Sequence, residues 1–209
     1  MIHILLSTAR SGSTWYGSKL AKSYHAEFLN EIFHDNNKAY HKKDLIQILQ
    51  NFADNDSCLI KIFPNHFFKS SVKNLDKLLF DTTTSVEILI RRNFTDQVKS
   101  LYVAQEYESL KNPAHDIHRL HTWQDDFLEP FIIDHVDDRK LGIMCHRLKK
   151  ELTFLSEVYK TYNFKLTYFE DVKDDVVREH SFKVGKLHRP VIWKEPFPVI
   201  NFNTESLFR

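Results

Sequence analysis

Four runs of apolar residues along the chain predict buried β-strands. Each run is five or six residues long, is rich in Ile, Leu, Val or Phe, and gives way to polar residues or to proline. Runs of this length and composition are typical of strands that are covered on both faces. The predicted strands are Ile2–Leu6, Cys58–Phe63, Val86–Ile90 and Phe164–Phe169.

Between these runs, apolar residues recur every three or four positions, which is the period of an amphipathic helix. The clearest case lies between Arg139 and Tyr162, with the apolar positions Leu141, Met144, Cys145, Leu148, Leu152, Leu155, Tyr159 and Tyr162. Shorter helices are predicted at about 13–24, 42–52, 95–110 and 115–131. The last forty residues, 170–209, have no clear period, and we expect an irregular C-terminal strap or lid.

Strands that alternate with helices and are apolar on both faces predict an α/β fold, with a central parallel sheet flanked by helices in three layers. A length of 209 residues fits one domain spanning 1–209. In such sheets, ligands bind at the carboxyl ends of the strands. We therefore expect the candidate chemistry in the residues that follow each predicted strand.

The overall charge excludes one class of partner. Lys and Arg number 29 against 28 Asp and Glu, so the net charge of +1 predicts no nucleic-acid binding through a broad basic surface. No apolar run approaches the ~20 residues of a membrane span. The first strand begins at residue 2, and Cys58 and Cys145 match no metal-ligand spacing. We expect a cytoplasmic protein with free thiols.

The first predicted strand runs into a polar turn and then a helix, an arrangement that binds anions. The turn reads Ala9-Arg10-Ser11-Gly12-Ser13-Thr14-Trp15. The first N–H groups of a helix point at an anion, glycine allows close approach, and arginine and hydroxyl groups add donors. The fold would be P-loop-like, although the GxxxxGK sequence of nucleotide-binding P-loops is absent.

A second candidate anion site follows the strand Val86–Ile90. Arg92 comes just after this strand, and Ser100 lies eight residues later, about two turns into the next helix. Asp96 is placed to cap that helix or to lie in its first turn. An arginine and a serine at this spacing suit a second phosphate, so a ligand with two separated phosphates would bridge both sites.

These two motifs resemble those of the sulfotransferases that use 3′-phosphoadenosine-5′-phosphosulfate (PAPS). The family's first motif, P-[KR]-S-G-[ST]-T-W, has alanine in place of proline here, and its second, R-N-P-x-D-x-x-x-S, has Phe94 in place of proline. The resemblance implies that PAPS is the donor and PAP the product, that no metal is required, and that the acceptor is a small molecule or carbohydrate with a hydroxyl or amine group. It assigns the donor to Arg10, Ser11, Gly12, Ser13, Thr14, Trp15, Arg92 and Ser100.

Sulfuryl transfer also needs a base that takes the acceptor's proton. Many family members have Lys-x-His after the second strand; here Lys61 is present, Phe63 occupies the histidine position, and His66 follows three residues later. The alternative is Glu31, in a segment similar to one that bacterial carbohydrate sulfotransferases place in the active site. The catalytic candidates are thus Glu31, His66, Lys61 and Arg10, with Glu31 favoured over His66 as the base.

The sequence leaves the roles of the late strand end and the final loop open, and it allows two alternative functions. A weaker match to the family's late Y-E-D strand end occurs at Tyr168-Phe169-Glu170-Asp171, and Lys186 or Arg189 are candidates for the 3′-phosphate in the final loop. A domain that binds PAPS or PAP without turnover is one alternative function. A nucleotide kinase-like phosphotransferase is the other, although the P-loop lysine it would need is missing.

Overall fold

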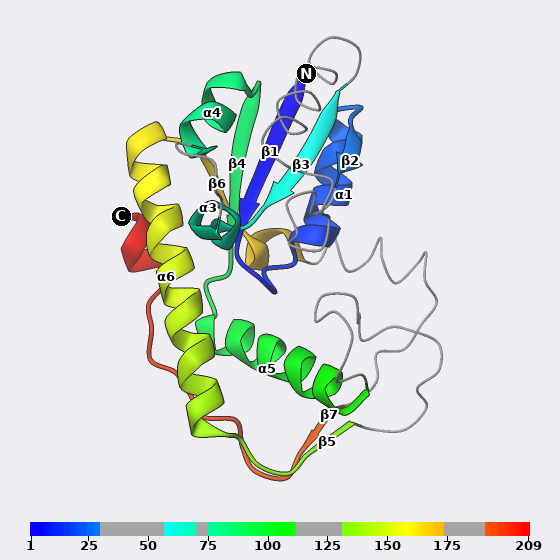
Figure 1. Cartoon of the computed structure of the whole chain (residues 1–209), viewed down its shortest axis with the longest axis vertical. Coiled ribbons are helices and arrows are strands. Elements are labelled where there is room, and N and C mark those ends of the chain that lie inside the picture. The colour runs from blue at the N-terminus through cyan, green and yellow to red at the C-terminus, as the bar shows by residue number, and fades with distance from the viewer. Residues whose placement is uncertain (30–56, 70–74, 112–130, 174–190) are drawn as a thin grey trace.

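The fold is described from a computed structural model of the whole chain. The description covers residues 1–29, 57–69, 75–111, 131–173 and 191–209 (Figure 1). Two sequence predictions, the helix at 42–52 and nearly all of the helix at 115–131, lie outside these residues.

A five-stranded parallel sheet forms the centre of the molecule, which confirms the predicted α/β class. Its spatial order is β2-β3-β1-β4-β6, and every neighbouring pair is parallel. The strands are β1 (Ile2–Ser7), β2 (Glu27–Leu29), β3 (Cys58–Ile62), β4 (Ser85–Ile90) and β6 (Lys165–Tyr168). All four predicted strands are present; the short edge strand β2 was not predicted.

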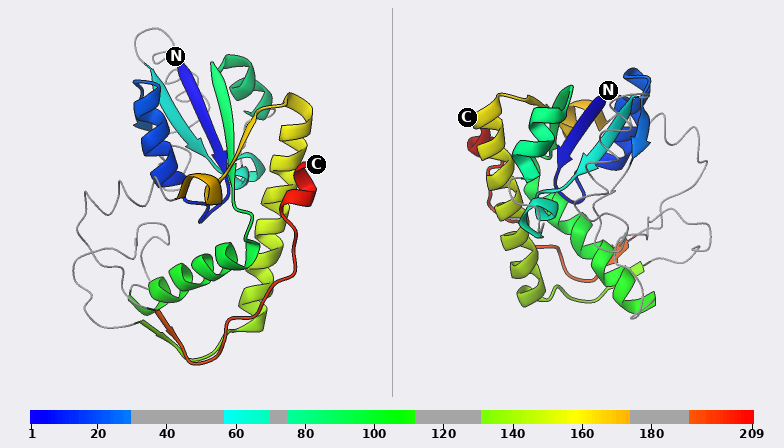
Figure 2. Two further views of the ribbon diagram at one scale, coloured as in Figure 1. Left: turned by 180° about the vertical axis from the view of Figure 1, so that it is seen from behind. Right: turned by 45° about the horizontal axis from the view of Figure 1, so that its top comes forward.

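Helices cover both faces of this sheet, which gives the predicted three layers (Figures 1 and 2). Side chains alternate along β1: Leu5 packs toward α1 (Ser13–Ser23), whereas Ile4 and Leu6 face the larger core beneath α4 (Leu75–Thr82) and α6 (Asp138–Tyr162). This alternation is the period of two that a strand imposes. It explains why the strand is apolar at nearly every position.

Helix α6 follows its predicted stripe closely. Leu141, Met144, Leu148, Leu152 and Leu155 are all buried, whereas Cys145 and Tyr159 are half-buried and Tyr162 is exposed. The helix begins where Asp137 accepts a hydrogen bond from the backbone N–H of Lys140 at 3.0 Å, a typical N-cap. Cys58 and Cys145 are both free thiols.

Two further helices follow the carboxyl ends of strands. The short α3 (Pro64–Lys69) comes directly after β3, and α5 (Phe94–Lys111) follows β4 and crosses beyond the carboxyl ends of the sheet (Figure 1). Helix α5 agrees with the predicted helix at 95–110, whereas α3 and α4 were not predicted. No helix in the described ranges is long and apolar enough to cross a membrane.

The described part of the C-terminal segment, 191–209, contains two short regular elements joined by irregular chain. Its strand β7 (Val191–Trp193) pairs in parallel with β5 (Phe131–Ile133), and the segment then returns along α6 to a short 3-10 helix, η1 (Glu205–Phe208) (Figures 1 and 2). Phe131, assigned to a helix by its sequence pattern, instead begins β5. Three-residue strands carry too few positions to show a period of their own, which is why β5 and β7 were missed.

Candidate anion-binding site

The first candidate loop joins β1 to α1 through two residues in left-handed conformation. Arg10 has a φ of 61° and Gly12 a φ of 80°, and Gly12 is the N-cap of α1. Since glycine has no side chain, Gly12 cannot itself cap the N–H groups of the helix's first turn. These groups and the positive end of the helix dipole lie where the sequence predicted an anion to bind.

Lys61 connects this loop to the neighbouring strand. It lies on the face of β3 that α1 covers, is 1% exposed, and its Nζ donates to Thr14 Oγ1 at 2.9 Å. Thr14 is the second residue of α1, so a buried ammonium group lies under the start of that helix. A cation so placed adds to the positive potential of the first turn.

The two predicted motifs meet directly. Arg10 Nε donates to Ser100 Oγ at 3.1 Å, which joins the first loop to α5 across ninety positions of sequence. Gln97, one helical turn before Ser100, is fully buried and its Nε2 donates to Thr8 Oγ1 at 2.5 Å and to the Ala9 carbonyl at 2.7 Å. Gln97 was not among the predicted site residues. Its spacing of three from Ser100, which places both on one helix face, was the available signal.

Several buried polar atoms at this loop have no hydrogen-bond partner among the described residues. They are Ser7 Oγ, Ser11 Oγ, Gln97 Oε1, Arg91 Nε and Glu151 Oε2. Buried polar groups in folded proteins nearly always have partners, so these atoms mark unused hydrogen-bonding capacity. Ser11 Oγ and the Arg91 guanidinium group fit an anionic ligand, and so does the uncapped helix start.

Glu151 of α6 approaches the same loop from the other side. It is 1% exposed, and its Oε1 accepts a hydrogen bond from Arg147 Nε at 3.0 Å. Burial raises the pKa of Glu151 above its ordinary value, and Arg147 partly offsets that rise. The hydrogen bonds that hold the loop to a neighbouring helix therefore come from Gln97 of α5, while Glu151 places a buried carboxylate close to the Ala9 backbone.

The remaining predicted residues of the first loop are buried or half-buried. Ser11 and Ser13 are buried in the loop and at the first position of α1, and Trp15 is half-buried against the smaller core beneath that helix. A Cβ atom placed on Gly12 would lie 2.2 Å from Phe169 Cε2, so the aromatic ring after β6 closes one side of the loop.

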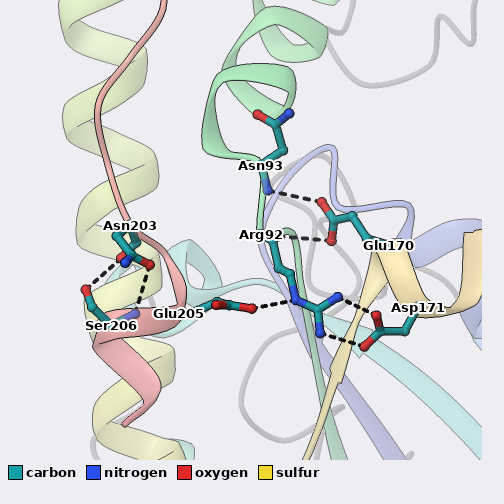
Figure 3. Close-up of polar contacts among 7 residues, drawn as sticks. All are labelled: Arg92, Asn93, Glu170, Asp171, Asn203, Glu205 and Ser206. Carbon is teal, nitrogen blue, oxygen red and sulfur yellow. Dashed lines mark hydrogen bonds and ion pairs between the residues drawn. The ribbon is translucent and has the colours of Figure 1, made fainter.

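Arg92, in contrast, is bound by carboxylates (Figure 3). Its Nε donates to Glu205 at 2.6 Å, and its two terminal nitrogens form a bidentate pair with Asp171. The Tyr168 ring covers one face of the guanidinium group at 4.0 Å. The Asp171 contact, followed by Glu205, raises the pKa of Arg92. A phosphate that binds Arg92 has to displace one of these carboxylates or use the remaining terminal N–H groups.

The residues around Arg92 shape the second motif. Asn93 and Asp96 cap α5 reciprocally, with Asp96 N donating to Asn93 Oδ1 at 3.0 Å and Asn93 Nδ2 donating to Asp96 Oδ2 at 2.8 Å. Glu170 accepts from the backbone N–H groups of Arg92 and Asn93 at 3.0 and 3.1 Å. The late Glu170-Asp171 pair therefore holds the turn between β4 and α5.

An open hollow lies next to Arg92. It has a volume of about 660 Å³ and is lined by Arg92, Ile200, Asn201, Phe202, Asn203 and Glu205. Its wall comes mainly from the C-terminal segment, which the sequence left unassigned.

Of the two candidate bases, only His66 lies within the described residues. His66 is 9% exposed at the start of α3, and its Nδ1 accepts a hydrogen bond from the backbone N–H of Phe63 at 3.2 Å. An Nδ1 that accepts from an N–H carries no proton, so in the neutral ring the proton is on Nε2. Nε2 is then a donor, and this geometry does not suit a base. Glu31, Lys186 and Arg189 lie outside the described residues.

Comparisons with known proteins add little to this geometry. No family model matches the chain, and no curated protein does. A solved structure from the PezAT chromosomal toxin–antitoxin system of Streptococcus pneumoniae aligns with 54% of this chain at 13% identity and a TM-score of 0.34. The aligned part spans about half of that protein, 55% of its chain. A likeness at this TM-score carries no argument for a shared fold or function.

Proposed function

We propose that this protein is a PAPS-dependent sulfotransferase that transfers a sulfuryl group to a hydroxyl or amine acceptor. The observation that supports this most is the 3.1 Å hydrogen bond between Arg10 Nε and Ser100 Oγ. It places the two motifs of the sequence resemblance side by side, at the carboxyl ends of the neighbouring strands β1 and β4. One ligand with two phosphate groups could contact both motifs there.

The proposed reaction breaks the bond between sulfur and the 5′-phosphate oxygen and forms a bond from sulfur to the acceptor. The acceptor's proton passes to a base, and PAP leaves. Arg10, the N–H groups at the start of α1 and the Lys61–Thr14 pair would stabilise the negative charge that develops on the leaving phosphate. Such interactions accelerate the reaction only insofar as they strengthen in the transition state.

The acceptor class follows from the resemblance and is part of the proposal. It is a small molecule or a carbohydrate with a nucleophilic hydroxyl or amine. Glu31 is the proposed base, because His66 Nδ1 already accepts from Phe63.

The donor site is tested by calorimetric titration with PAP in metal-free buffer. We expect wild-type protein to bind, and Arg10→Ala and Ser100→Ala each to weaken binding about tenfold or more, since both remove a contact to a charged phosphate. Arg139→Ala and Thr153→Ala are matched controls, because both residues are exposed on α6. They should bind PAP as the wild type does.

The outcomes separate the proposed function from its alternatives. Absence of PAP binding by the wild-type protein would refute the donor assignment. Binding without PAP release from PAPS across a panel of sugar, phenol and amine acceptors would indicate a non-catalytic PAP-binding protein. Phosphate transfer that requires ATP and Mg²⁺ would indicate the kinase-like alternative.

A further inference from the structure

Arg91 and Arg92 are adjacent in sequence but lie in opposite electrostatic environments. Arg92 makes three hydrogen bonds to the carboxylates of Asp171 and Glu205. Arg91 turns toward the first loop, where its Nη1 donates to the Arg10 carbonyl at 3.4 Å. The resemblance assigned the donor phosphate to Arg92 and gave Arg91 no role.

The charge of Arg91 has no bonded counterion among the described residues. Its Nε is buried without a partner, and the long contact to Arg10 is its one hydrogen bond within that part of the chain. Burial lowers the pKa of Arg91, and the carboxylates of Glu170 and Asp96 act on it only at a distance. Arg91 is half-buried, and a charged group whose buried nitrogen has no bonded partner is a candidate for binding an anion.

The position of Arg91 relative to the loop is set by Phe169. The Arg91 guanidinium group lies over the Phe169 ring, 4.8 Å from its centroid. The edge of the same ring reaches the position that a Cβ of Gly12 would occupy, at 2.2 Å. The Phe169 ring thus contacts both Arg91 and the N-cap of α1, whose first N–H groups have no side-chain cap.

We infer that Arg91 is an anion-binding residue of the first loop and contacts the phosphate ester that binds at the start of α1. This inference rests on the proposed function, since the ligand is taken to be the 5′-phosphate end of the donor nucleotide. Arg91 and Arg10 would both contact that group. The Arg10 carbonyl accepts a hydrogen bond from Arg91, and the Arg10 side chain donates one to Ser100. Arg92 would mainly fasten the C-terminal segment through Glu205.

The test compares Arg91→Ala, Arg91→Lys and Arg92→Ala by calorimetric titration with PAP and with adenosine 5′-phosphate, which lacks the 3′-phosphate. We expect Arg91→Ala to weaken both ligands by the same factor, about tenfold or more, as for a lost charge-assisted contact. Arg91→Lys keeps the charge but loses the planar group, and should fall between alanine and wild type. Arg92→Ala should change the affinity for adenosine 5′-phosphate by less than about threefold, and should lower the thermal unfolding midpoint.

Each outcome decides one point. If the wild-type protein binds PAP, and Arg91→Ala binds each ligand as tightly as the wild type does, this inference is wrong while the proposed function stands. A loss for PAP alone would place Arg91 at the 3′-phosphate and also overturn it. If Arg91→Ala does not fold, the lysine variant decides, because wild-type affinity there would exclude a role for the guanidinium group. No binding by the wild type refutes the proposed function itself.

Discussion

Gly12 is the residue of the first loop at which both the backbone conformation and the packing favour glycine. Its φ of 80° lies in the left-handed region, and the Phe169 ring fills the space where a side chain would begin. Gly142, on an exposed face of α6, has neither restriction, since nothing lies within 4 Å of a Cβ placed there. Only the first of these two glycines is required by the fold.

We predict opposite effects for alanine at these two positions. Gly12→Ala should destabilise the protein by about 2 kcal/mol or more, because the left-handed conformation alone costs an alanine roughly 1–2 kcal/mol and the contact with Phe169 adds to it. Gly142→Ala should stabilise it by about 0.5–1 kcal/mol, since alanine favours a helix interior. Urea unfolding of both variants measures the difference. A Gly12→Ala variant as stable as the wild type would show that the loop tolerates a side chain.

Helix α1 is fastened to the sheet by one buried carboxylate. Glu87 lies on β4, is 3% exposed, and accepts hydrogen bonds from the Tyr16 hydroxyl, from Thr167 Oγ1 at 2.6 Å and from Lys165 Nζ at 3.0 Å. Burial, followed by the Glu87 contact, raises the pKa of Tyr16. The network joins α1, β4 and β6, and the start of α1 is where we propose that the anion binds.

Removing the Glu87 carboxylate should therefore loosen α1. We expect Glu87→Ala to lower the free energy of unfolding by about 3 kcal/mol or more, because the buried Tyr16 hydroxyl and the half-buried Thr167 hydroxyl both lose a charged acceptor, whereas Lys165 is exposed to water. Tyr16→Phe should cost about 1.5–3 kcal/mol, as for one hydrogen bond to a charged group. Asp134→Asn breaks the exposed ion pair with Lys194 and is the matched control, with no measurable change expected. Equal effects of Glu87→Ala and Asp134→Asn in urea unfolding would contradict the role of this network.

At the scale of the whole molecule, the C-terminal segment returns to the sheet and the helices beside it. Ile200 N donates to Thr95 Oγ1 at 3.0 Å, Phe202 packs on Phe94 with ring centroids 4.6 Å apart, and Glu205 binds Arg92. These contacts join residues more than a hundred positions apart. Arg92 is the centre of this attachment, because Asp171 holds it from the end of β6 while Glu205 holds it from η1.

The attachment should depend on pH through Asp171. Arg92 lowers the pKa of Asp171 below its ordinary value of 3.8. A carboxylate with a lowered pKa in the folded state contributes stability above its ordinary pKa and loses it as the pH falls through the folded value. Asp171→Asn should thus unfold at a lower temperature than wild type at pH 7, and the difference should shrink below pH 3.8. Thermal melts across this range measure it, and a pH-independent difference would argue against the ion pair.

The sequence by itself determined the parts of the fold whose signals are local. The strands β1, β3, β4 and β6 and the helices α1, α5 and α6 were all predicted, because several consecutive positions of each carry one period. The loop around Gly12 was predicted from another local signal, because a strand, a small-residue turn and a helix start follow one another directly. Elements of three residues, such as β2, β5 and β7, carry too few positions to be read this way.

Only the tertiary structure decided which side chains meet. The residues around Arg91 and Arg92 do not show which partners these side chains meet, yet one turns to the first loop and the other to carboxylates 79 and 113 positions away. The same holds for Arg10 and Ser100, which belong to separate motifs of the sequence and are joined by a hydrogen bond in the structure. The partners of a charged side chain depend on the direction in which the folded backbone points it and on distant segments packed there, and a short stretch of sequence contains neither.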